Sequence, residues 1–218
     1  MTERLPRPDG GKIRDTAIDV GEIVSFVAGD ELLRVHPSGG AHPVAWNEFR
    51  AWGPTGSRFD HQARPVGRHA TRRIAYLTYG PEAFTAALGE FFQDDNGTVM
   101  PFDLTRRSPR VVSLALAADL QLLQLASGWV TRAGGNQAIW SGARGTARDW
   151  ARAIYRHHGD DVHGVAYPSS VWGPGRCVAL WERAEPTMPD APLLTRALAD
   201  PTMLVPIAVA AEKLGTYF

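Results

Sequence analysis

Ser169 lies in the stretch VHGVAYPSSVWGPGRC, between two short apolar runs, and a Gly-Pro-Gly turn follows it. A serine at the end of a strand suggests a nucleophile, which in many hydrolases stands in a Gly-x-Ser-x-Gly turn that leads into a helix. Here the local sequence is Tyr-Pro-Ser-Ser-Val, and the Gly-Pro-Gly sequence blocks a helix. His163 and Asp161 are near in sequence, but nothing indicates that they converge on Ser169. The residues alone therefore favour a serine whose hydroxyl caps a turn.

Glu90 is the most informative carboxylate of the chain. It belongs to the segment 81–94, PEAFTAALGEFFQD, which is predicted to be a helix with one apolar stripe. Glu90 lies beside that stripe, and Ala86 and Ala87 precede it by one turn. Small neighbours of this kind leave room for a ligand next to a carboxylate. The alternative is a solvent-exposed helical glutamate, which is the commoner case.

Three further polar side chains occur where they could hold a ligand. Arg34 interrupts the apolar strand ELLRVH, on the strand face opposite Leu33, and Arg58 follows Gly-Pro-Thr-Gly-Ser in a loop of tight turns. Arginine offers a planar, permanently charged fork that suits phosphate groups, although either arginine could simply be solvated. Tyr76 lies in the middle of the strand IAYLTY, where a tyrosine is more often a core ring than a ligand platform.

The histidines do not form a metal-binding pattern. His157, His158 and His163 are close together, but adjacent histidines on a helix point in different directions, and no cysteine or carboxylate completes a metal spacing. Histidines at a helix end that interact with the C-terminal dipole are the better interpretation. No metal is therefore predicted.

Composition places the protein among ordinary globular proteins. The 218 residues suit one domain, and the 23 basic and 23 acidic residues cancel, which argues against binding to nucleic acid or to a membrane surface through charge. The single cysteine, Cys177, cannot form an internal disulfide. No signal peptide and no run near 18 apolar residues is present. A soluble, cytoplasmic protein is expected.

The predicted elements alternate irregularly between strands and helices, which indicates an α+β fold. Residues 1–20 are expected to be a flexible N-terminal arm, and 21–218 a single domain with a long functional loop at 38–67. The segment 120–125 is a strand or a helix, and 191–215 is predicted to be helical with interruptions at Pro201 and Pro206. The clearest periodic segments are the strand 72–80, the helix 81–94 with its stripe of Phe84, Leu88 and Phe91, and the helix 146–159 with Ala147, Trp150, Ala151 and Ile154.

Taken together and in chain order, these features resemble the RES domain family, which is named for its arginine, glutamate and serine. The resemblance rests on LLRVHP, GSRFDH, IAYLTYGPEAFTAALGEFF and GVAYPSSVWGPGRCVALWE, the last similar to the family's Gly-Ile-x-Tyr-x-Ser element. It covers about residues 31–182. The chain departs from the family at Leu33, where an aromatic residue is usual, and at Asp60, an acid that would weaken the hold of Arg58 on a phosphate. Residues 126–149 have no recognisable counterpart.

The resemblance implies both a fold and an activity. RES proteins typically are toxins of bacterial toxin–antitoxin pairs that consume NAD by hydrolysis or phosphorolysis, with a fold similar to ADP-ribosyltransferases. The implied site comprises Arg34, Arg58, Tyr76, Glu90 and Ser169, with Glu90, Arg34 and Ser169 as catalytic residues and Arg34, Arg58, Tyr76 and Ser169 holding NAD. The implied partner is a helix-turn-helix antitoxin. Separately, the apolar C-terminal segment MLVPIAVAAEKLGTYF is a candidate docking surface for a second copy of the chain, although core packing is the commoner use of such a segment. The alternatives are an ADP-ribosyltransferase with a macromolecular target and a non-catalytic nucleotide-binding or interaction module.

Overall fold

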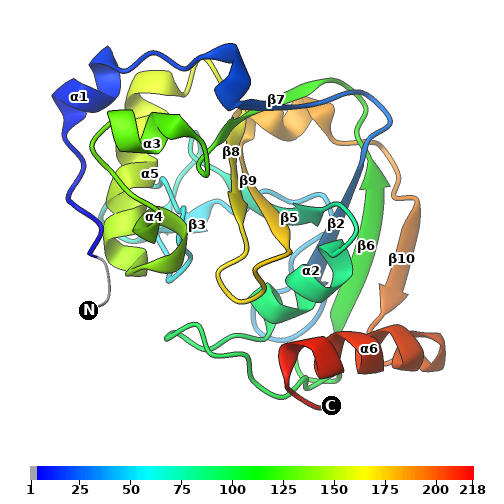
Figure 1. Cartoon of the computed structure of the whole chain (residues 1–218). Helices are drawn as coiled ribbons and strands as arrows, with labels where there is room; N and C mark the ends of the chain where they lie inside the picture. The colour runs from blue at the N-terminus through cyan, green and yellow to red at the C-terminus, as the bar shows by residue number, and fades with distance from the viewer. Residues whose placement is uncertain (1–3) are drawn as a thin grey trace.

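A mixed eight-stranded sheet forms the centre of the protein in the computed structural model, which describes residues 4–218 (Figure 1). Every neighbouring pair of strands is antiparallel except β7 and β8, which are parallel. The predicted α+β class is confirmed. From edge to edge the strands are β1 (Ile23–Phe26), β7 (Leu120–Gln124), β8 (Gly164–Pro168), β9 (Arg176–Trp181), β5 (Ile74–Tyr79), β2 (Glu31–Pro37), β6 (Pro109–Ala115) and β10 (Leu194–Ala197).

Two groups of helices cover one face of this sheet. The first group, on the left in Figure 1, is α1 (Gly10–Asp15), α3 (Gly128–Arg132), α4 (Ala138–Ser141) and α5 (Arg144–His158), and the second is α2 (Ala83–Phe91) and α6 (Leu204–Leu214). Cross-strand partners share a face of a sheet, so the register Cys177↔Thr78↔Leu33 carries one face from β9 through β5 to β2. Both helix groups pack on that face.

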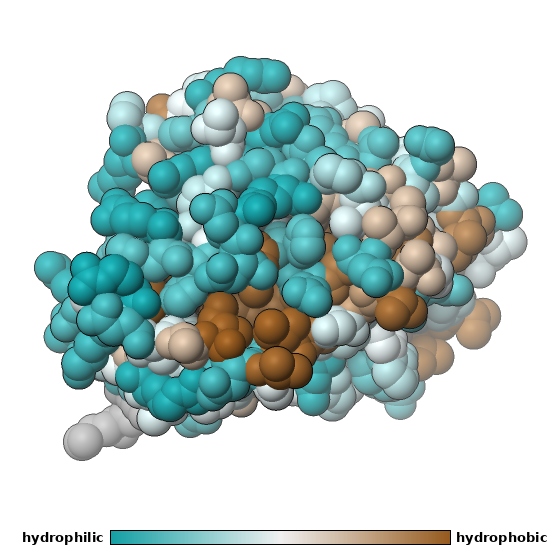
Figure 2. All heavy atoms as spheres, turned by 90° about the horizontal axis from the view of Figure 1, so that it is seen from above, coloured by the Kyte–Doolittle hydropathy of each residue, from teal (hydrophilic) through white to brown (hydrophobic). Residues whose placement is uncertain are grey.

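The helix α5 illustrates how the sequence pattern produces the packing. Ala147, Trp150, Ala151 and Ile154 recur at helical spacing and are all buried, as predicted, while charged residues occupy the other side. Gly159 follows its last residue. The helical side of the molecule, on the left in Figure 2, presents a mostly hydrophilic surface.

The helix α2 is buried through small side chains. Its stripe was predicted to consist of Phe84, Leu88 and Phe91, but only Leu88 is fully buried, whereas both phenylalanines are half-buried. Alanine and glycine residues replace them at the contact surface, because the helix approaches its neighbours too closely for larger groups. Behind α2 lies α6, whose buried Ile207 joins Leu88 in one core cluster. Two further connections between these helices are an ion pair of 2.8 Å from Lys213 Nζ to Glu82 Oε1 and the proximity of Leu214 to Gly89.

The described part of the predicted N-terminal arm packs against the first helix group. Leu5 and Ile13 are buried, and two indole N–H groups of the core donate to carbonyl oxygens of this segment, Trp150 to Pro6 at 2.8 Å and Trp129 to Thr16 at 3.1 Å. These contacts show that residues 4–20 form part of the domain's packing, although their composition is typical of a loose arm.

The segment predicted to be helical over 191–215 contains a strand in its first part, so that prediction is wrong there. Residues 194–197 form β10, which pairs with β6 and completes one edge of the sheet. The helical part then begins with a 3-10 turn at Pro201, capped by the Asp200 side chain, and continues as α6. Pro206 lies in the first turn of α6. Backbone N–H groups in this turn form no hydrogen bond within the helix, so a proline, which lacks the N–H, is tolerated there.

The long segment 38–67 is largely irregular, as predicted. Its regular structure in the described chain is β3 (Trp52–Gly53) and the first residue of β4 (Gly67–Arg68), which pairs with β3. Phe49 and Phe59 anchor the loop, one on each face of the sheet. The segment 120–125, for which a helix was an alternative, is the strand β7. Among residues 4–218, no helix combines the length and the hydrophobicity needed to cross a bilayer.

Candidate active site

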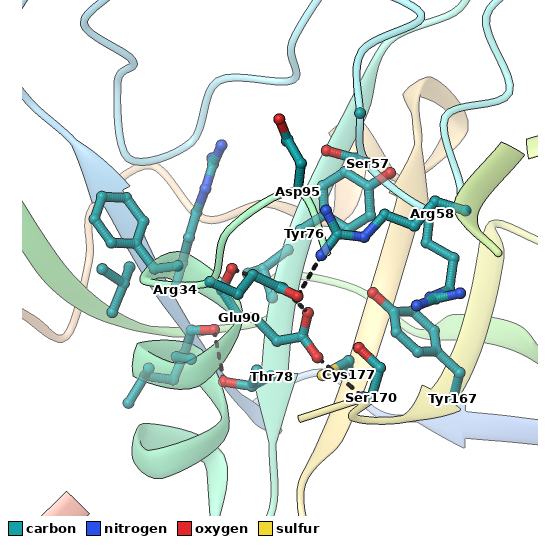
Figure 3. Close-up of a pocket in the computed structure, with 18 residues that line it drawn as sticks. Arg34, Ser57, Arg58, Tyr76, Thr78, Glu90, Asp95, Tyr167, Ser170 and Cys177 are labelled. Atoms are coloured by element: carbon teal, nitrogen blue, oxygen red, sulfur yellow. Dashed lines mark hydrogen bonds between the residues drawn. The ribbon is translucent and has the colours of Figure 1, made fainter. Parts of the chain in front are cut away.

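A pocket of about 360 Å³ opens on the helix-covered face of the sheet, between α2 and the start of α5 (Figure 3). Its walls come from β2, the loop 56–58, β5, α2, residues 93–95, the first residue of α5, and the ends of β8 and β9 that face one another across the serine turn. This volume lies near the lower end of the range for small-molecule sites. The pocket therefore gathers residues that lie far apart in the chain, from Leu33 to Cys177.

Glu90 has both carboxylate oxygens held by hydrogen bonds at the pocket wall. Oε1 accepts from the Ser169 hydroxyl at 2.7 Å and from the Ser170 backbone N–H at 3.1 Å, and Oε2 accepts from Gln93 Nε2 at 2.6 Å. In Figure 3 the carboxylate points toward Ser170 and the centre of the pocket. Three donors from two elements thus fix one orientation of the carboxylate.

The Ser169 side chain has two roles at once. Its hydroxyl donates to Glu90, and the same oxygen accepts from the backbone N–H groups of Val171 at 3.3 Å and Trp172 at 3.2 Å. The turn-capping interpretation of this serine is therefore confirmed, and the cap also orients a carboxylate. Ser169 is buried and touches Glu90, whereas the neighbouring Ser170 lines the pocket itself.

Glycine at two positions allows α2 to approach the serine turn. A Cβ atom on Gly89 would lie 2.8 Å from Val171 Cγ2, and a Cβ atom on Gly175 would lie 2.6 Å from the Cβ of Ala86. Real Cβ atoms do not approach so closely, so a larger residue at either position would force the helix and the turn apart. The hydrogen bonds to Glu90 depend on this close contact.

Two arginines supply positive charge to the other side of the pocket. Arg58, at the end of the loop 56–58, donates to the carbonyl of Gly142, and burial lowers the pKa of its guanidinium. Arg144, the first residue of α5, donates through Nη2 to Gln93 Oε1 at 2.5 Å and to the Asp94 carbonyl at 3.2 Å. Both line the pocket, so it combines a fixed carboxylate with two cationic forks.

The Asp60 carboxylate is bonded to Arg50, Thr55 and Tyr76 rather than to Arg58, the arginine whose hold on a phosphate it was expected to weaken. This carboxylate is fully buried and accepts from Arg50 Nη2 at 2.6 Å, from Thr55 N at 2.6 Å and from the Tyr76 hydroxyl at 2.7 Å. The charge of Asp60 is thus paired with Arg50 inside the loop. Burial raises the pKa of Tyr76, which keeps its hydroxyl a neutral donor to Asp60.

Two neutral side chains, Tyr167 and Cys177, complete the pocket wall beside Glu90. Burial is the main cause that raises the pKa of the Cys177 thiol, and the nearby Glu90 carboxylate raises it further. Burial likewise raises the pKa of Tyr167. A thiol with a raised pKa stays protonated and is a poor nucleophile, so Cys177 contributes shape rather than reactivity.

The sequence that builds this pocket matches a known protein family. The RES domain model matches residues 31–199, a range that contains every pocket residue described above. The chain belongs to the RES domain family. A comparison with curated proteins finds no match.

Four of the five predicted site residues of this RES domain, Arg34, Arg58, Tyr76 and Glu90, line one pocket, and the fifth, Ser169, lies directly behind Glu90. The guanidinium of Arg34, however, donates through Nη1 to the carbonyls of Trp46 and Glu48, both at 2.9 Å. Figure 3 shows it directed away from Glu90. Burial lowers the pKa of Arg34 to about 10, so it remains charged at neutral pH.

The pocket residues of the RES domain that sequence reasoning missed include Gln93, Arg144 and Ser170. Gln93 follows Glu90 at a spacing of three, so helical neighbour rules could have found it. Ser170 contributes its backbone N–H, which leaves no signature in the sequence. Arg144 lies in the stretch 126–149, which carries no family motif, and only the tertiary fold brings it to the pocket.

The histidine cluster has structural partners. His158 lies at the end of α5, and its ring contacts the Ile13 carbonyl at 2.8 Å and Asp161 at 3.1 Å. His163 Nδ1 accepts from the Gln121 backbone N–H at 3.2 Å. Within residues 4–218, no group of three or more His, Cys, Asp or Glu side chains is placed to hold a metal ion.

Proposed function

We propose that this RES domain consumes NAD by cleaving the bond between nicotinamide and ribose. The observation that carries the proposal is the Glu90 carboxylate, which Ser169 and Ser170 orient at the wall of a pocket that also holds Arg58 and Arg144. A dinucleotide presents a cationic nicotinamide ribose at one end and an anionic pyrophosphate beyond it. One fixed carboxylate and two arginines match these charges.

The chemistry of this bond explains why one carboxylate suffices. The bond joins the ribose C1 to a positively charged ring nitrogen, and when it breaks the electron pair goes to that nitrogen. Nicotinamide therefore leaves as a neutral molecule and needs no general acid, whereas ordinary glycosidases use two carboxylates. The positive charge that develops on the ribose is what the site must stabilise, and a fixed carboxylate does this electrostatically.

The remaining side chains are assigned by what they can reach. Arg58 and Arg144 bind the pyrophosphate through charge-assisted hydrogen bonds, and Tyr76 stacks against a ring of the dinucleotide. Ser169 positions Glu90, since its hydroxyl is bonded to that carboxylate. Arg34 acts indirectly by holding the carbonyls of Trp46 and Glu48 behind the pocket wall.

The incoming group decides which product forms. Attack by water gives ADP-ribose and one proton, and attack by inorganic phosphate gives ADP-ribose 1″-phosphate. Glu90 can accept the proton of an attacking water or hold the ribose hydroxyls. Attack by a side chain or base of a macromolecule would instead make the protein an ADP-ribosyltransferase.

Product analysis tests the proposal. The purified protein is incubated with NAD, with and without phosphate, and nicotinamide, ADP-ribose and ADP-ribose 1″-phosphate are separated by chromatography. Nicotinamide release is expected from the wild type, and a loss of about 100-fold or more is expected in Glu90→Gln. Glu212→Gln, which removes one exposed carboxylate from α6, is the matched control. Nicotinamide release by Glu90→Gln at the wild-type rate would refute the role of Glu90, and measurable NAD binding without turnover would indicate a non-catalytic module.

We also propose that this activity makes the protein a cytoplasmic toxin restrained by a helix-turn-helix antitoxin, as is typical of the family. Depletion of NAD is the expected cause of toxicity. Expression of the wild type in a bacterial host should lower cellular NAD and stop growth, whereas Glu90→Gln at the same protein level should do neither. Equal growth arrest by both proteins would show that the toxicity does not come from NAD consumption.

A further inference from the structure

A second hollow, of about 560 Å³, lies between the N-terminal segment and the start of α5. It is separate from the NAD pocket, and six charged residues line it: Arg4, Arg7, Arg64, Arg148, Arg152 and Asp149. The chain as a whole is neutral, with 23 basic and 23 acidic residues. Five arginines around one hollow are therefore a local concentration of charge that the general composition does not explain.

Most of this positive charge is uncompensated. Arg152 pairs with Asp149, the one acidic residue of the lining. Arg148 makes one long hydrogen bond, 3.5 Å from Nη1 to the Ser57 carbonyl. Among the residues that the structure describes, Arg4, Arg7 and Arg64 form no ion pair. Four guanidinium groups thus face one hollow without a carboxylate of their own.

Backbone N–H groups at the start of α5 add to the positive charge around the hollow. Gly145 and Thr146, in the first turn of α5, line the same hollow. The residue before the helix, Ala143, offers no capping side chain, and no acidic residue lies in the first turn. The first N–H groups of a 15-residue helix and the positive end of its dipole are therefore available to an anion.

We propose that this hollow binds a small oligophosphate, either free or as part of a nucleotide, at a site distinct from the NAD pocket. Guanidinium forks hold phosphate oxygens in pairs, and several arginines from three segments suit a chain of phosphates better than a single one. The volume lies within the range of small-molecule sites. The arginines surround a concave site rather than a long surface, which favours a small anion over a nucleic-acid backbone.

Titration calorimetry at low ionic strength tests the site, with inorganic pyrophosphate and tripolyphosphate as probes. Arg7→Gln/Arg64→Gln removes two exposed arginines of the hollow, and Arg106→Gln/Arg196→Gln removes two exposed arginines elsewhere as a control with the same charge change. Arg58→Gln removes one arginine from the NAD pocket and serves to test whether the anion binds there instead. We expect binding to weaken by about tenfold or more in the first variant and to persist in the other two. Unchanged melting temperatures would show that all variants are folded.

Three results would overturn the proposal. The first is no binding by the wild type, and the second is binding that is lost in Arg58→Gln but kept in Arg7→Gln/Arg64→Gln, which would place the anion in the NAD pocket. The third is tighter binding of a short DNA duplex than of tripolyphosphate with the same loss in Arg7→Gln/Arg64→Gln, which would identify a nucleic-acid surface.

Comparison of tripolyphosphate with ATP separates a free oligophosphate from a nucleotide, since added affinity for ATP indicates contacts to the nucleoside. Because the readout is binding alone, it is independent of NAD cleavage.

Discussion

The hydroxyl of Ser169 lies 2.7 Å from Glu90 Oε1, although 79 residues separate the two in the chain. Glu90 lies in the last turn of α2 and Ser169 directly follows β8, so their contact depends on the packing of α2 against the serine turn. Ser169 thus helps to orient the carboxylate. The effect of this serine on activity can be measured separately from its effect on stability.

Substitution of Ser169 by alanine removes one of the two donors to Glu90 Oε1 and the acceptor for two backbone N–H groups. We expect kcat for NAD cleavage to fall by about 10- to 100-fold while KM changes little, because a misdirected carboxylate stabilises the transition state less well. Unfolding should cost about 1–3 kcal/mol less, since buried N–H groups lose their partner. Ser170→Ala keeps the backbone N–H donor and serves as control. An equal kcat loss in both variants would contradict the positioning role.

Substitution of Gly175 by alanine inserts a Cβ atom 2.6 Å from that of Ala86. The turn and α2 must then separate, and we expect a loss of about 1–3 kcal/mol in unfolding free energy together with lower NAD cleavage. Gly173→Ala in the same turn meets no atom within 4 Å and should change neither quantity much. Urea denaturation and nicotinamide release measure the two effects. Full activity of Gly175→Ala would show that the close approach is dispensable.

Stability should fall as the pH decreases below about 6.5. Burial lowers the pKa of His61 and of His36 from the ordinary value of 6.5. Between the lowered pKa and 6.5 the unfolded chain binds protons that the folded chain does not, so the unfolding free energy decreases as the pH falls through this range. Urea denaturation at pH 7.5 and 5.5 measures the difference in unfolding free energy between the two pH values. This difference should be smaller in His61→Gln and unchanged in His42→Gln, which removes an exposed histidine.

The N-terminal segment should contribute to global stability. Ile13 is fully buried in the same core cluster as Trp150 and Ile154, so Ile13→Ala should lower the unfolding free energy by about 2–5 kcal/mol. Val20 is 89 % exposed, and Val20→Ala should change the unfolding free energy by less than about 0.5 kcal/mol. Thermal or urea denaturation compares the stability of the two variants. If the two variants were equally stable, residues 4–20 would behave as an independent arm.

Helices and strands were predicted correctly where the apolar residues of the segment recur with the period of that element. In β5 successive side chains point to opposite faces of the sheet, with Ile74 in one core cluster and Ala75 and Leu77 in another, and in α5 the apolar stripe recurs at helical spacing. The strand β10 has no such pattern. It is half-exposed at the edge of the sheet and is held by its pairing with β6, about 80 residues earlier, which a local pattern cannot reveal. The packing of the N-terminal segment is equally hard to predict from a local pattern, since Leu5 and Ile13 are isolated buried residues in a polar stretch.

The site was predictable only in part. Glu90, Arg58 and Ser169 lie in recognisable local motifs, and the fold brings them together. Asp60 is close to Arg58 in the sequence, but its ion-pair partner in space is Arg50, which no local pattern indicates. Arg144 could not be inferred, since its position depends on where α5 begins relative to the sheet.

The packing of α6 behind α2 has a practical meaning for genetic screens. Glu90 is fixed to a helix whose other side rests on the last helix of the chain, through the core that Ile207 and Leu88 share and through the ion pair from Lys213 to Glu82. Under the toxicity proposed above, selection for survivors should therefore return lesions in the final twenty residues as well as around the pocket. Such alleles would lower catalysis by tilting the carboxylate, and a second change that restores the fit between the two helices would suppress them.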